Sequence, residues 1–131
     1  MARDWWEYQR LSRGSRGERK ALEMGVPEQA QAAHDFVDQM VERGSREAIE
    51  LLAVLTEANP TGNDGTAVGT GPLEDLIHEH GDELIDEIEL YARTRPPVAQ
   101  ALAVVWVERG HLNADTEDRL KTWVAQFTVN P

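Results

Sequence analysis

Apolar residues recur at intervals of three and four through most of this chain, and no segment alternates apolar and polar residues over a useful length. The first spacing lines up apolar side chains on one face of a helix, whereas alternation is typical of a half-buried strand. The sequence therefore predicts an all-α fold with no sheet. A length of 131 residues is also usual for one domain with its own core, so we expect a single domain over residues 1–131.

Two of the predicted helices are apolar nearly all round, so their neighbours must cover them. One follows the capping residue Ser45, and the other extends from Val98 to Val107. Short connections favour antiparallel neighbours, which predicts a compact bundle of about six helices arranged as stacked αα-hairpins. The outer helices are expected from Pro27 to Gly44, from Pro72 to Gly81, from Asp82 to Ala92, and after the turn at 110–113.

The apolar segments 46–55 and 97–106 resemble each other faintly, which suggests a HEAT-like repeat tendency. The N-terminal segment is too aromatic for a loose tail, and it predicts a short helix from about Asp4 to Leu11 that docks against the body. Residues 12–25 are rich in glycine, serine and basic residues at their start. That composition predicts a flexible basic linker.

Charge is unevenly placed along the chain. Residues 1–25 contain six basic and four acidic residues, whereas the remainder contains seven basic and twenty acidic residues. No lysine or arginine lies between Arg46 and Arg93, although that stretch contains twelve acidic residues. A surface of that sign repels phosphate backbones and favours basic protein surfaces. We therefore expect no nucleic-acid partner and consider a basic protein partner.

Several other classes of function are disfavoured by composition. The chain has no cysteine, which excludes disulfides, thiolate nucleophiles and thiolate metal sites. No apolar run approaches the roughly 18 residues of a membrane-spanning helix, and no signal-peptide core follows Met1. We expect a cytoplasmic protein without a membrane partner. The basic linker lacks the glycine spacing of a phosphate-binding loop, and we expect no cofactor.

The sequence resembles a bacterial family known only as a domain of unknown function. The resemblance rests on the run from Gly71 to Ile77, on His80-Gly81-Asp82, and on the downstream Leu102 and Trp106. It implies that the family's pattern also includes an early Trp and Tyr, here Trp5 or Trp6 and Tyr8, and a helix pair like that from Pro27 to Ala58. The chain departs from that pattern in residues 12–25 and at Pro96-Pro97. The resemblance implies no catalytic residue.

The strongest enzymatic candidate is a cluster of carboxylates and imidazoles around Gly81. Helical spacing places Glu74 and His78 on one face, with His80 close by, and these residue types bind divalent metals. The spacing differs from His-Glu-x-x-His, and the buried helices supply no further ligand. We therefore predict no metal site and keep Glu74, His78 and His80 as weak candidates.

His34-Asp35 matches the dipeptide of HD phosphohydrolases, but a lone dipeptide is weak support for such a site, and we expect His34 on an amphipathic face. Trp106 and Trp123 lie among apolar residues, and we interpret both as core residues. We predict no catalytic residue.

These observations favour a protein–protein interaction module over an enzyme. Its partner-binding face would resemble that of small immunity or antitoxin-like proteins. The alternatives are a metal-dependent hydrolase at the Glu74, His78 and His80 cluster, a structural domain that forms homo-oligomers, and a merely solubilising acidic surface. The residues expected in the partner-binding face are Glu79, Asp82, Glu83, Asp86, Glu87 and Glu89.

Overall fold

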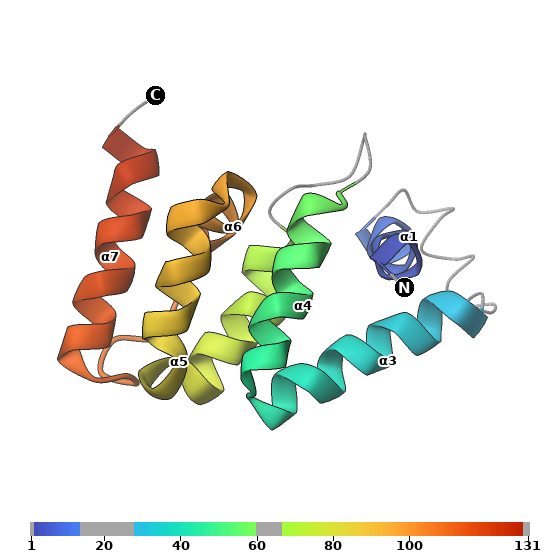
Figure 1. The fold of residues 1–131 in the computed structure, drawn as a ribbon, viewed down its shortest axis with the longest axis horizontal. Helices are drawn as coiled ribbons and strands as arrows, with labels where there is room; N and C mark the ends of the chain where they lie inside the picture. Colours follow the sequence, from blue (N-terminus) through green and yellow to red (C-terminus); the bar gives the residue numbers. More distant parts are fainter. Residues whose placement is uncertain (1, 14–27, 60–66, 130–131) are drawn as a thin grey trace.

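The computed structural model describes residues 2–13, 28–59 and 67–129, and these form helices joined by loops (Figure 1). No strand occurs within these ranges. The all-α prediction is therefore confirmed. The described helices are α1 (Ala2–Arg13), α3 (Glu28–Arg43), α4 (Arg46–Glu57), the π-helical turn η1 (Gly69–Leu73), α5 (Glu74–Thr94), α6 (Pro96–Ala103) and α7 (Ala114–Val129).

The two helices predicted to be buried, α4 and α6, pack against each other in the middle of the molecule (Figure 1). Leu52, Leu55 and Leu102 are almost fully buried there. Helix α1 packs on α3 and α4 at one end, and α7 packs on α6 and α5 at the other. The faint likeness between segments 46–55 and 97–106 does not establish a repeat, because α4 has 12 residues and α6 has only eight.

Helix α1 confirms the docking of the aromatic N-terminal segment. Trp5 and Trp6 are each only 1% exposed, and the indole Nε1 of Trp6 donates a hydrogen bond to the Leu55 carbonyl at 2.8 Å. That carbonyl is one of the last four of α4, which lack an intrahelical partner. The predicted linker 12–25 lies outside the described residues, apart from Ser12 and Arg13, which belong to α1.

Helix α5 corrects the prediction of two helices separated at Gly81. It is continuous from Glu74 to Thr94, and Gly81 is buried in its middle. A Cβ at Gly81 would lie 3.1 Å from the Ile77 side chain and 3.3 Å from that of Leu112. The glycine therefore allows close packing of the loop before α7 and does not end the helix.

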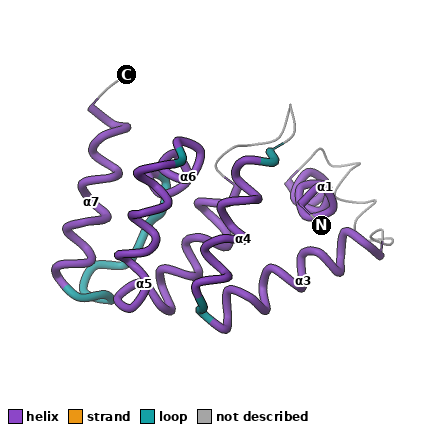
Figure 2. The backbone as a smooth tube through the Cα atoms, in the orientation of Figure 1, coloured by secondary structure: helices purple, strands orange, loops and turns teal. Residues whose placement is uncertain are grey.

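The segment after α6 corrects a second prediction. The helix expected to reach Val107 ends at Ala103, and residues 104–113 continue to α7 as a loop (Figure 2). Val105 is buried in this loop, but Trp106, which we expected in the core, is 71% exposed. The run of β-branched and aromatic residues from Val104 to Val107 has lower helix propensity than the alanine-rich residues before it.

Candidate binding sites

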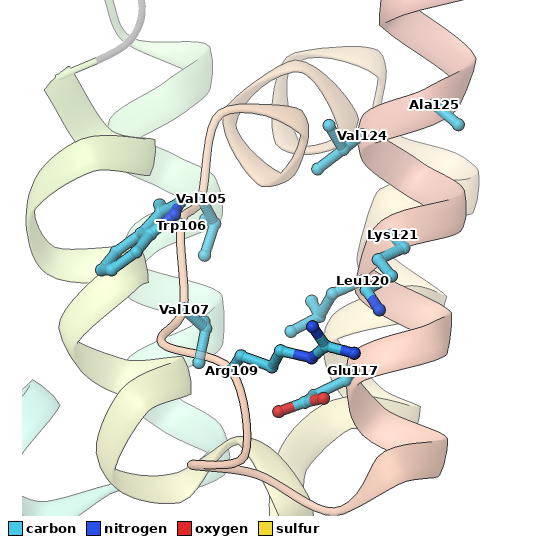
Figure 3. Close-up of a pocket in the computed structure, with 9 residues that line it drawn as sticks. All are labelled: Val105, Trp106, Val107, Arg109, Glu117, Leu120, Lys121, Val124 and Ala125. Atoms are coloured by element: carbon cyan, nitrogen blue, oxygen red, sulfur yellow. The ribbon is translucent and has the colours of Figure 1, made fainter.

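An open hollow lies between the loop after α6 and one side of α7 (Figure 3). Its volume is about 760 Å³, within the range of sites that bind small molecules. We call it the loop–α7 hollow. Its lining residues are Val105, Trp106, Val107, Arg109, Glu117, Leu120, Lys121, Val124 and Ala125.

Extended backbone after α6 sends successive side chains to opposite sides of the loop. Val105 and Val107 face the hollow, whereas the indole ring of Trp106 lies on the other side of the loop (Figure 3). The Trp106 backbone N–H donates a hydrogen bond to Glu74 Oε2 at 3.1 Å. Buried Val105 before it and this bond to α5 hold the Trp106 backbone in a defined position, from which an exposed indole extends.

Two basic side chains extend over the same hollow. Arg109 reaches from the loop toward α7, and Lys121 points toward it from α7 (Figure 3). Neither forms an ion pair with any residue that the structure describes. Glu117 also lines the hollow, and its Oε1 accepts a hydrogen bond from the Gly110 N–H at 2.6 Å. Glu117 thereby ties the loop to α7.

Two acidic residues of α5, the buried Glu89 and the exposed Asp86, share one arginine of α7. Glu89 is only 7% exposed, and its carboxylate accepts hydrogen bonds from Arg119 Nε at 2.6 Å and from Trp123 Nε1 at 2.8 Å. Arg119 Nη2 also donates to Asp86 Oδ1 at 2.6 Å. These two carboxylates raise the pKa of the Arg119 guanidinium, with the hydrogen bond to Asp86 as the largest cause. The network joins α5 to α7, and local spacing could not predict its pairings because each bonded pair is separated by 30 or more residues.

The other four residues of the predicted acidic face lie outside this network. Asp82 Oδ1 accepts a hydrogen bond from the Asn113 N–H at 2.9 Å, and Glu87 lies 4.0 Å from the Arg46 guanidinium. Glu79 is 3.9 Å from the His80 imidazole. Glu83 is exposed and has no ion pair among the described residues.

Carboxylates from α3 and α5 approach one another on the same surface. Partial burial raises the pKa of the Asp75 carboxyl, and the nearby carboxylates of Glu79, Asp38 and Glu74 raise it further. Asp38 belongs to α3, so the packing of two helices brings these charges together. This acidic cluster across two helices could not be read from the spacing within either helix.

The three weak candidates for metal ligands each contact a different part of the fold. Glu74 accepts the Trp106 N–H, His78 stacks on His111 with ring centroids 3.7 Å apart, and His80 Nε2 lies 3.0 Å from the Glu42 carbonyl. The His80 ring also covers Gly44, whose φ of 65° suits a residue without a Cβ. Within residues 2–13, 28–59 and 67–129, no three metal-ligating side chains are grouped so as to hold an ion.

His34 is half-buried on α3, as expected for an amphipathic face. Its ring stacks on Tyr8 of α1 with centroids 3.9 Å apart, and its Nε2 lies 3.3 Å from the Asp38 carboxylate. Trp123 is buried, which confirms its assignment to the core. Neither residue faces the loop–α7 hollow.

Two features of the loop after α6 and its surroundings were missed from sequence. Arg109 and Lys121 were not considered together because they belong to different elements, and Trp106 was assigned to a helix that ends before it. The consecutive β-branched residues around Trp106 were the available signal for that end. No comparable signal exists for the approach of Arg109 to Lys121.

Comparison with known proteins places the chain in a family. No curated protein and no solved structure matches it. Among the described helices, none is both long and apolar enough to cross a membrane. A family model for a family of unknown function matches residues 20–126, which include Gly71, His80 and Trp106 but not the aromatic residues of α1. Since the match spans more than half of its length, the chain belongs to this family of unknown function, DUF6869.

Proposed function

We propose that this chain is a protein-interaction module whose contact surface is centred on Trp106. The observation that carries the proposal is the 71% exposure of Trp106 on a loop whose backbone is bonded to Glu74 of α5. Tryptophan is enriched among the residues that contribute most to protein–protein binding, because it buries a large area at low entropic cost. Neighbouring Val104 is also exposed and extends the apolar surface.

Replacement of Trp106 by alanine separates a binding role from a structural one. We expect Trp106→Ala to change the free energy of unfolding by less than about 0.5 kcal/mol, because the side chain is mostly exposed. Capture of partner proteins by the immobilised chain should fall about tenfold or more, as measured by quantitative mass spectrometry of extracts from the source cell.

Phe36→Ala is the matched control, because Phe36 is also an exposed aromatic residue but lies on α3. Equal capture by wild type and Trp106→Ala would refute the proposal. Light scattering of both proteins distinguishes a second copy of this chain as the partner, since Trp106→Ala would then convert an oligomer into a monomer.

The acidic face is a second candidate surface for a basic partner. What supports it is the absence of lysine and arginine between Arg46 and Arg93, together with the approach of Asp38 to the carboxylates of α5. Two of the six residues expected in this face, Asp86 and Glu89, bind Arg119. We therefore propose that the available part comprises Glu79, Asp82, Glu83 and Glu87.

Charge reversal at Glu83 tests this second surface without disturbing the network with Arg119. If a basic partner binds there, Glu83→Lys should slow its association several-fold at low salt, and the difference should diminish as salt screens the charges. Surface plasmon resonance at several ionic strengths measures this. Asp118→Lys, an exposed reversal on α7, is the control, and equal association rates for Glu83→Lys and wild type would argue against the acidic face.

The metal-dependent hydrolase receives no support from the described residues. Glu74, His78 and His80 each have a separate bonding partner, and they do not converge on one point. We therefore base no catalytic proposal on them.

A further inference from the structure

We propose that the loop–α7 hollow binds a small amphiphilic carboxylate, that is, a molecule with one apolar body and one carboxylate group. This inference goes beyond the proposed protein-binding function and uses other side chains. It rests on the size of the hollow, its apolar walls and the two basic groups that extend over it.

The apolar walls come from both sides of the hollow. Val105 and Val107 approach from the loop, while Leu120 and Val124 approach from α7 (Figure 3). A volume of about 760 Å³ is far larger than a packing defect and accommodates an alkyl or aryl group. Transfer of such a group from water to these walls is favourable at about 25 cal/mol per Å² of buried apolar area.

The charge at the hollow is opposite to that of the chain as a whole. The chain has 24 acidic and 13 basic residues, yet Arg109 and Lys121 face the hollow with only Glu117 as an acidic neighbour in its lining. Elsewhere Arg46, Arg93, Arg95 and Arg119 each lie against a carboxylate of the protein. Arg109 and Lys121 have no such carboxylate among the described residues, so their charges are available to a ligand.

The same charges select a carboxylate over a more highly charged anion. A guanidinium and an ammonium together bind one carboxylate through charge-assisted hydrogen bonds. Glu117 and the net charge of −11 oppose a dianion such as a phosphate monoester. A ligand therefore matches the hollow if its apolar body contacts the walls and its single carboxylate meets Arg109 and Lys121.

Isothermal titration calorimetry of the whole chain with decanoate and with 1-decanol tests this site. The two probes share an apolar chain, and only decanoate carries a charge. We expect saturable binding of one decanoate, with 1-decanol at least about tenfold weaker, because a hydrogen bond to a charged group typically contributes a factor of this order. Equal binding of both probes would overturn the assignment of the anion site.

Variants locate the binding. Arg109→Gln with Lys121→Gln should weaken decanoate about tenfold or more and leave 1-decanol unchanged, and Val124→Trp should weaken both probes by filling the hollow. Arg43→Gln removes an exposed arginine on α3 and should have no effect. Circular dichroism checks that each variant is folded. Absence of saturable decanoate binding to the wild type, or unchanged binding to the double variant, would contradict the proposal.

Discussion

Replacing Arg119 by methionine is expected to lower the free energy of unfolding by about 2–3 kcal/mol, because it leaves the buried Glu89 carboxylate without its main basic partner. Loss of one member of a fully buried pair typically costs about 3–5 kcal/mol. The estimate is lower here because 28% of the Arg119 side chain is exposed and Arg93 lies 3.8 Å from Glu89. Urea denaturation followed by far-ultraviolet circular dichroism measures the change.

Two further variants identify the cause of that loss. Glu89→Gln in the Arg119→Met background removes the buried charge but keeps an acceptor for the Trp123 indole, so it should restore much of the stability. Arg93→Met should change stability by less than about 0.5 kcal/mol, because the Arg93 side chain is 61% exposed. Equal free energies of unfolding for Arg119→Met and Arg93→Met would show that the bonds of Arg119 to Glu89 and Asp86 do not hold α7 on α5.

Replacing Trp6 by alanine should have a still larger effect, about 3–5 kcal/mol, because it removes a fully buried indole. It also removes the donor to the Leu55 carbonyl at the end of α4. The family match begins at residue 20, so this part of the core comes from a segment outside the match. Thermal and urea denaturation should both show the loss.

Glu7→Ala provides the control on the same helix. Glu7 pairs with Arg10 on the exposed side of α1, and its removal should cost less than about 1 kcal/mol. A loss below about 1 kcal/mol for Trp6→Ala itself would mean that α1 contributes little to the folded state, in conflict with its burial.

The acidic face shows how much of a candidate site sequence can predict. Helical periodicity correctly placed Glu83 on the outside of α5, because spacing within one helix determines which side chains share a face. The same spacing places Glu89 on the buried stripe, four residues after Ile85 and three before Ala92, but it could not identify Arg119 and Trp123 of another helix as its partners. Patterns within an element do not specify which element will cover it.

The local spacing of apolar residues in the sequence determined the all-α fold class, the two buried central helices and the docking of the aromatic N-terminal segment. Each depends on apolar spacing over neighbouring residues and on the need to remove those side chains from water. Packing between distant segments decided the rest. It kept α5 continuous through Gly81 and brought Arg109 and Lys121 to one hollow. These outcomes depend on free energies of contact between residues far apart in the chain, which no local spacing encodes.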